Sequence, residues 1–297
     1  MFPKACTLYA LTDIVNADTL DKSLRKHQLT PIMDAEIATT GWAPVRDDYG
    51  VLAYNSSGVI MMRFGITKRL LPTAVIKDEV KKRCLEREKE QGFAPGRKAV
   101  REIKEDAIVA LTALAFPVTK YTNVFIDNAP HGNLLMIDST SNGVINEIIK
   151  SLLNLDDKFP IESISLEHSL ESQMRAWARG DVPADMTIES AIVLAGSGGS
   201  KVAYKNVDIA QEQLEEQFAA GRAISSLSMS YKDKIGFVLT PELKLKSIKV
   251  FDTLDEGDAA GNEHDRFHND IYLAGASLSS LASSLISAVN NPEEDLA

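Results

Sequence analysis

Apolar and polar residues alternate along the first 70 residues in a pattern typical of strands, interrupted by one stretch with helical spacing. Residues 5–11 predict an opening strand, and residues 19–27 predict a short amphipathic helix. Residues 51–55 and 59–67 predict a β-hairpin, because a short turn of serine and glycine separates two runs of strand character.

From Pro72 to residue 116 the spacing of apolar side chains becomes helical. Residues 73–91 predict one helix, whose apolar stripe at i, i+4 and i+8 consists of Ile76, Val80 and Cys84. The sequence Gly-Phe-Ala-Pro-Gly at 92–96 interrupts this helix, and a second helix follows. Its apolar face comprises Val100, Ile103, Ala107, Leu111 and Leu114. The two helices predict a charged helical hairpin inserted between β elements.

Strand and helix patterns alternate again after residue 118. Residues 120–126 and 133–137 predict strands, and a helix carrying apolar side chains from Val144 to Leu153 follows them. Residues 155–160 mark a boundary. Beyond it the sequence predicts helices at 170–179 and 210–220 and strands at 188–194, 201–204, 224–230, 235–239 and 243–251. A final helix sets an apolar face against serines, and that face comprises Leu278, Leu281, Leu285 and Val289.

These elements define an α+β fold. We expect two α/β units with antiparallel sheets, into which the charged helical hairpin is inserted. The first unit comprises residues 1–70 and 118–160, the hairpin comprises residues 71–117, and the second unit comprises residues 161–297.

Charge is unevenly distributed along the chain. The 32 Lys and Arg and 42 Asp and Glu give a net charge of -10, which disfavours nucleic-acid binding if taken as an average. Residues 63–104 alone contain 13 Lys or Arg and six Asp or Glu, a net of +7 that leaves -17 for the remainder. Because a phosphate-binding surface needs only a local positive face, this distribution permits binding to DNA.

Cysteine content and hydropathy set expectations for the compartment. Two cysteines in a chain of 297 residues indicate free thiols in a reducing cytosol. Nowhere do eighteen consecutive apolar residues occur, and no long apolar run follows the N-terminus, so we expect neither a membrane span nor a secretion signal. The expected location is the cytoplasm.

No motif supports a catalytic or cofactor site. His264 and His268 have the i, i+4 spacing of a metal pair on one helix face, but no third ligand accompanies them. The loop at 196–201 lacks the Gly-Lys-Ser/Thr ending of a phosphate-binding loop and predicts a hairpin turn. No nucleophile motif accompanies the other histidines, which are His27, His131 and His168. We therefore expect no catalytic residue, no metal, no cofactor and no enzymatic activity.

The basic side chains of the helical hairpin have two interpretations. Interspersed glutamates favour an ordinary solvated surface with i,i+4 ion pairs. The alternative is a surface that follows DNA phosphates and therefore binds any sequence. Its candidate contacts are Lys77, Lys81, Lys82, Arg83, Arg87, Arg97, Lys98 and Arg101. Lys244 and Lys246 share one face of the strand at 243–251 and are further candidates, with a lysine-protected edge strand as the alternative.

Short motifs in a fixed order along nearly the whole chain resemble the RdgC family. The first half carries Gly-Trp-Ala-Pro at 41–44, Leu-Pro-Thr-Ala-Val-Ile-Lys at 71–77, Leu-Ala-Phe at 114–116, Phe-Ile-Asp at 125–127 and Leu-Met-Ile-Asp at 135–138. The second half carries Trp-Ala-Arg-Gly at 177–180, Ala-Gly-Arg at 220–222 and the run from Ile235 to Lys249. Their collinearity, and no single motif, carries the resemblance.

The resemblance implies a ring-shaped homodimer that encircles single- and double-stranded DNA without sequence preference and competes with a RecA-type recombinase. In that family the helical hairpin is the tip whose pairing closes one side of the ring, and Phe116 matches the aromatic residue of this gate. Lys205 matches the DNA contact on the opposite, hinge side. Two departures stand out: Asn206 and Val207 follow Lys205, and the turn at 92–96 replaces a more basic stretch.

Together these arguments predict a non-catalytic, nucleoid-associated DNA-binding protein that restrains recombination. The alternative is an interaction protein that acts on the recombinase itself, with DNA binding incidental. Two positions also remain open for Phe116. It can fold back onto its hairpin as a satellite core residue, or pack across a dimer axis as an aromatic anchor, which the resemblance favours.

Overall fold

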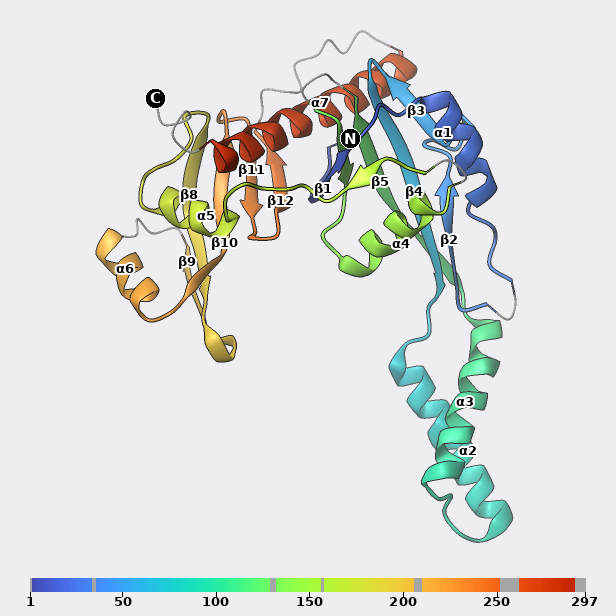
Figure 1. Ribbon diagram of the computed structural model, residues 1–297. Helices are drawn as coiled ribbons and strands as arrows, with labels where there is room; N and C mark the ends of the chain where they lie inside the picture. Colours follow the sequence, from blue (N-terminus) through green and yellow to red (C-terminus); the bar gives the residue numbers. More distant parts are fainter. Residues whose placement is uncertain are drawn as a thin grey trace. The chain divides into compact units, whose positions relative to one another are not determined.

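A computed structural model describes residues 2–33, 36–128, 132–155, 158–205, 210–251 and 262–291 of the protein (Figure 1). Within these residues the chain forms seven α-helices and a large antiparallel sheet, so the expected α+β class is confirmed. The helices are α1 (Ala17–Leu24), α2 (Thr73–Gln91), α3 (Arg97–Leu114), α4 (Asn142–Leu153), α5 (Leu170–Ala178), α6 (Gln211–Ala219) and α7 (Glu263–Asn290).

The sheet has twelve strands, and ten of them follow one another in the order β2-β4-β5-β6-β1-β12-β11-β10-β8-β9, while β3 pairs with β4 and β7 with β1. The strands are β1 (Cys6–Leu11), β2 (Ala38–Ala43), β3 (Ala53–Ser56), β4 (Val59–Arg69), β5 (Pro117–Asp127), β6 (Leu134–Ile137), β7 (Ile161–Glu162), β8 (Met186–Ala195), β9 (Lys201–Lys205), β10 (Ala223–Tyr231), β11 (Ile235–Leu239) and β12 (Lys244–Val250). The strands β2 and β7 were not predicted from the sequence.

One continuous sheet replaces the two that the sequence predicted, because β1 has partners on both sides. It pairs with β6 over four residues and with β12 over two, where Cys6 lies opposite Leu245 and Thr7 opposite Lys244. The short β1–β12 ladder therefore joins the strands of the N-terminal half to those of the C-terminal half. Such a join depends on pairing between residues more than 230 positions apart, which local periodicity does not reveal.

The contacts of the chain define two compact units. Unit 1 comprises Met1–Leu24, Pro44–Arg63 and Thr122–Ala297, and unit 2 comprises Arg25–Ala43 and Phe64–Tyr121. The helical hairpin α2–α3 therefore belongs to unit 2 together with β2. The domain boundaries expected from the sequence, at residues 70, 117 and 160, remain a prediction.

Helix α7 is central to the core of unit 1. Its predicted apolar face is confirmed, since Leu278, Leu281, Leu285 and Val289 are all buried. By length and composition α7 could cross a membrane, but half of its apolar window is buried inside the protein, as in a core helix. A Cβ on Gly275 would lie 2.3 Å from Cγ1 of Val59, so glycine allows α7 to approach β4 closely.

The core of unit 2 is organised around one aromatic pair. Trp42 of β2 and Phe64 of β4 are both buried, and their ring centroids lie 5.0 Å apart with an interplanar angle of 73°. This edge-to-face arrangement is a favourable geometry for aromatic side chains. It anchors β2 beside β4, the strand that leads towards the helical hairpin.

Candidate nucleic-acid interface

The helical hairpin forms because glycine and proline residues set its ends. The predicted bounds of α2 are confirmed, and the helix begins directly after Pro72. It ends at Gly92, whose left-handed backbone (φ 83°) lets its N–H donate to the carbonyl of Glu88 at 2.8 Å. Gly96 then caps the start of α3. The five-residue turn between them therefore brings α3 back against α2.

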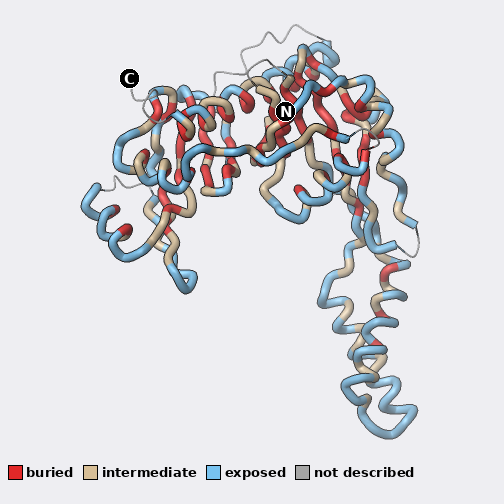
Figure 2. Tube along the Cα trace, viewed as in Figure 1, coloured by how far each residue is buried: buried red, intermediate tan, exposed pale blue. Residues whose placement is uncertain are grey.

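A thin apolar seam holds the two helices together. Ile103 and Ala107 of α3 are buried, whereas the stripe of α2, which consists of Ile76, Val80 and Cys84, is only half-buried. The predicted stripe of α3 is wrong at its last position, because Leu114 is 79% exposed at the end of the helix. The described part of α2 contains no fully buried residue, so most of the hairpin surface faces solvent (Figure 2).

Most of the predicted basic contacts lie on that solvent-facing surface. Six of them are exposed, and in the part of the chain that the structure describes none of the six has a carboxylate within ion-pair distance. These six are Lys77, Lys81, Lys82, Arg87, Arg97 and Lys98. Arg101 is also exposed, and its Nε lies 3.1 Å from Glu105 Oε1. With Lys89 and Lys104, which are also exposed, the hairpin carries nine exposed cations.

Arg83 differs from the other candidates because it forms an ion pair that is largely covered. Its Nε donates to Glu79 Oε1 at 2.7 Å, and both side chains are largely covered. The hydrogen bond from Arg83 lowers the pKa of Glu79 below its usual value. This i,i+4 pair matches the alternative interpretation of the hairpin as a surface with internal ion pairs.

An exposed apolar patch lies where the hairpin joins β4 and β5. Phe116 is 84% exposed and Leu70 is 58% exposed, and the backbone nitrogen of Leu70 donates to the carbonyl of Phe116 at 3.2 Å. Arg69 braces the same segment, since its Nη1 donates to the carbonyl of Ala115 at 2.9 Å. The interpretation of Phe116 as a satellite core residue is therefore wrong within this chain, and its role at a dimer gate remains a prediction.

Alternation places Lys244 and Lys246 of β12 on one face, and a bulge adds a third lysine that the sequence did not reveal. Lys244 is half-buried, and its Nζ donates to Asn142 Oδ1 at 2.6 Å, while Lys246 is exposed. The pairing of β12 with β11 shifts register, and Ser247 has a positive φ of 50°. This bulge buries Ile248 and leaves Lys249 exposed. Lys249 is thus a cation on β12 that alternation alone would have placed inside.

The position of β12 excludes one of its two interpretations, and DNA contact by Lys244 and Lys246 remains a prediction. A lysine-protected edge strand is wrong here, because β12 lies between β1 and β11 in the sheet. The edge strand with lysines is β9, on which Lys201 and Lys205 are both exposed. Lys205 therefore lies in unit 1 at the end of an edge strand, and the predicted departure at Asn206 and Val207 falls outside the described residues.

The two histidines of α7 have structural partners. His264 Nδ1 lies 2.8 Å from the Tyr49 hydroxyl, and His268 Nδ1 lies 3.2 Å from the Tyr54 hydroxyl. The carbonyl of His268 accepts a hydrogen bond from Ser56 Oγ at 2.7 Å. These contacts attach the first turns of α7 to the β3–β4 region. Among the described residues, no group of three or more His, Cys, Asp or Glu side chains is placed to hold a metal ion.

The glycine-rich segment at 196–200 is the predicted hairpin turn. It connects β8 to β9, and the ladder closes with Ala195 opposite Lys201. Gly198 and Gly199 have positive φ values of 75° and 80°, which glycine adopts readily. His131, one of the scattered histidines, lies outside the described residues.

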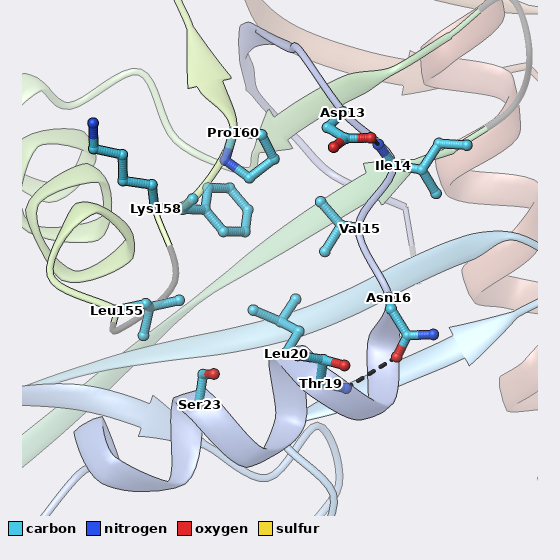
Figure 3. Close-up of a pocket in the computed structure, with 11 residues that line it drawn as sticks. Asp13, Ile14, Val15, Asn16, Thr19, Leu20, Ser23, Leu155, Lys158 and Pro160 are labelled. Carbon is cyan, nitrogen blue, oxygen red and sulfur yellow. Dashed lines mark hydrogen bonds between the residues drawn. The ribbon is translucent and has the colours of Figure 1, made fainter.

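A hollow of about 280 Å³ lies in unit 1 beside the start of α1 (Figure 3). Leu20, Leu155 and Phe159 form a buried apolar side, while Asp13 and Lys158 are exposed at its rim. None of the basic residues predicted to contact DNA lines this hollow. The candidate interface therefore comprises the hairpin of unit 2 and, separately, strand β12 of unit 1.

Comparisons with known proteins agree with the motif order of the sequence. Residues 1–291 match the RdgC family model, described as "Putative exonuclease, RdgC". The "Recombination-associated protein RdgC" of Herminiimonas arsenicoxydans is 32% identical over 284 residues, which cover 94% of both chains. The protein of the same name from Burkholderia cenocepacia is 32% identical over 286 residues, 95% of this chain and 92% of that relative. The predicted resemblance is confirmed: the chain belongs to the RdgC family of recombination-associated proteins.

Proposed function

We propose that the protein binds single- and double-stranded DNA without reading its sequence, and that it works without catalysis as a ring-shaped homodimer. In the cytoplasm, at the nucleoid, such binding would compete with a RecA-type recombinase and restrain recombination. The recombination-associated names of its relatives support this role.

The observation that carries the proposal is the set of exposed cations on the helical hairpin. Eight basic side chains of α2 and α3 project into solvent without a carboxylate partner in the described residues, although glutamates are interspersed along both helices. Unpaired cations are free to replace the counterions of DNA phosphates. Because phosphates are identical at every base step, contacts of this kind favour binding that is indifferent to sequence.

Two further features support the proposal. The bulge at Ser247 aligns Lys246 and Lys249 as exposed cations on β12. The apolar patch that contains Leu70 and Phe116 is left uncovered within one chain, as expected of a surface that pairs with a second copy.

Salt dependence of DNA binding tests the proposal. Gel retardation of a duplex and of a single strand, with no recombinase present, should give affinities that fall steeply as salt rises. If Z phosphates are contacted, the slope of log K against log salt is about -0.9Z for duplex DNA, so four contacts give a slope near -3.6. A flat salt response, or retention of DNA only when recombinase is added, would overturn it and favour the interaction protein.

Intact DNA is the second expected outcome. End-labelled duplex incubated with the protein and Mg²⁺ should keep its full length, whereas progressive shortening would contradict a non-catalytic role and agree with the exonuclease description of the family model.

A further inference from the structure

A second hollow in unit 1, of about 290 Å³, lies between the β10–β11 turn and the middle of α7. Lys232 and Lys234 line it from the turn, and Ser277 and Ser280 line it from the helix. Tyr231 contributes a phenol hydroxyl. No Asp or Glu is among the described residues that line it, so cationic and hydroxyl donors converge there without a carboxylate.

The turn that carries the lysines adopts an uncommon backbone. Lys234 N donates to the carbonyl of Tyr231 at 2.9 Å, and the two residues between them, Lys232 and Asp233, have positive φ values of 49° and 54°. Tight turns with two positive φ angles favour Asn and Gly, because side chains with a Cβ are disfavoured in the left-handed region. A lysine held in this conformation suggests that its side chain, and not the turn, is what this position requires.

The donors of the hollow are held in place by contacts between the turn and α7. The hydroxyl of Tyr231 lies 2.9 Å from Ser280 Oγ and so bridges β10 and the helix. Lys232 Nζ lies 4.9 Å from the centroid of the Tyr231 ring. Hydrogen bonding to the Tyr231 side chain raises the pKa of Lys232 above its ordinary value.

Two carboxylates lie near the turn and weaken its positive potential. Asp185 contributes to the raised pKa of Lys232, but one of its carboxylate oxygens already accepts a hydrogen bond from Ser284 Oγ at 2.7 Å. Asp233 lies in the turn itself, is exposed, and does not line the hollow. Because the Tyr231 hydroxyl is already bonded to Ser280, the lining presents two ammonium groups and the hydroxyls of Ser277 and Ser280 to any group that enters.

We propose that this hollow binds a phosphoryl group, with Lys232 and Lys234 balancing its charge and the hydroxyls of Ser277 and Ser280 donating to its oxygens. Charge-assisted hydrogen bonds of this kind suit tetrahedral oxyanions. The phosphoryl group can belong to a free phosphorylated small molecule or to the DNA backbone. The site lies in unit 1 and uses none of the hairpin residues on which the proposed function rests.

Binding of radiolabelled inorganic phosphate by equilibrium dialysis of the full-length protein, at constant ionic strength, tests the site. The double variant Lys232→Gln, Lys234→Gln should weaken phosphate binding at least about tenfold, since each charged donor contributes strongly. Lys22→Gln with Lys150→Gln, two exposed lysines on α1 and α4 of the same unit, should leave it unchanged. Lys232→Asn should raise the melting temperature, because Asn tolerates positive φ, and yet weaken phosphate binding.

A parallel gel retardation assay identifies the source of the phosphoryl group. If the Gln double variant also loses DNA affinity, the phosphoryl group belongs to the DNA backbone. If DNA affinity is unchanged, the ligand is a free phosphorylated molecule. No measurable phosphate binding by the wild-type protein, equal binding by the variant, or equally effective competition by acetate would overturn the proposal, even where DNA binding itself is found.

Discussion

Oδ1 of Asp138 lies 3.2 Å from the backbone nitrogen of Lys4, and so ties the end of β6 to the residues that precede β1. The same oxygen accepts a longer hydrogen bond from Ala5 N at 3.4 Å. Burial nevertheless raises the pKa of Asp138 to about 6, because loss of solvation outweighs these hydrogen bonds and the nearby charge of Lys4. The ionised carboxylate is thus disfavoured in the folded protein near neutral pH.

Asp138→Asn should therefore stabilise the protein above pH 6. A carboxyl group with a raised pKa binds its proton more tightly when folded, so its contribution to stability is complete below its ordinary pKa and is lost as the pH rises through 6. Because the side chain is only partly buried, solvent screening reduces the effect to on the order of 1 kcal/mol at pH 7.5. Urea unfolding of both proteins at pH 4.5 and 7.5 measures the difference.

The exposed Asp181 provides the control, since Asp181→Asn should change stability little at either pH. If the stability difference between wild type and Asp138→Asn were the same at pH 4.5 and pH 7.5, the pKa of Asp138 would not be raised by folding.

Element types were predictable wherever local periodicity decides them, and the helical hairpin is the clearest case. Glycines at 92 and 96 and the helical spacing on either side define α2 and α3 without reference to the rest of the chain. Strand β2 was missed because Ala38–Ala43 shows no alternation, and its buried end depends on distant partners such as Phe64.

The chemistry of the candidate site was less predictable than its residue types. Sequence spacing favoured i,i+4 ion pairs on α2, but it did not reveal that Arg83 pairs with Glu79 while the neighbouring predicted contacts have no such partner in the described residues. It also could not place Lys249, because the bulge at Ser247 arises from the register between β11 and β12. Local spacing predicts which basic residues could contact DNA. Contacts in the folded chain determine which of them are exposed and which are paired with a carboxylate.

Gly275→Ala tests the close approach of α7 to β4. Alanine's higher helix propensity should stabilise the protein by up to about 1 kcal/mol. Its Cβ, however, would lie 2.3 Å from Cγ1 of Val59, whose branched side chain is short and rigid. Overpacking of this kind costs roughly 1–3 kcal/mol, so we expect net destabilisation of about 1 kcal/mol in thermal unfolding.

Gly143→Ala in α4 is the matched control, because a Cβ there meets nothing within 4 Å and the propensity gain should appear alone. Adding Val59→Ala to Gly275→Ala should recover part of the lost stability. If Gly275→Ala proved as stabilising as the control, α7 would not be seated against Val59 as described.

Arg97→Glu combined with Lys98→Glu should weaken DNA binding while leaving folding unchanged. Both side chains are exposed at the start of α3 and away from the buried Ile103 and Ala107, so the charge reversal removes contacts without disturbing the seam. The loss should be similar for unrelated DNA sequences, and the salt slope should become shallower by about 2.

Lys22→Glu with Lys150→Glu, two exposed lysines on helices of unit 1, makes the same change in net charge and serves as the control. Affinities measured by gel retardation should be affected far less in this variant. Equal losses in both variants would mean that overall charge, and not the hairpin, determines DNA affinity.

Phe116→Ala tests the predicted gate. Phe116 is 84% exposed, and the hydrogen bond of its carbonyl to Leu70 involves only backbone atoms, so truncation opens no cavity in the chain. The melting temperature should therefore change little, corresponding to less than about 0.5 kcal/mol. An aromatic side chain buried across a dimer axis commonly contributes 2 kcal/mol or more, so dimer dissociation measured by sedimentation should increase by roughly thirtyfold.

The comparison with Phe93 makes the result specific to this position. Phe93 is 66% exposed at the turn of the same hairpin, so Phe93→Ala removes another exposed ring from its other end. Only Phe116→Ala should speed the release of protein from closed circular DNA, since a ring that opens at its gate lets circular DNA escape. Similar release from the two variants would indicate a general effect of losing surface aromatics. A large drop in melting temperature with unaltered release would mean that Phe116 supports the fold, and the patch that it forms with Leu70 would then need a different explanation.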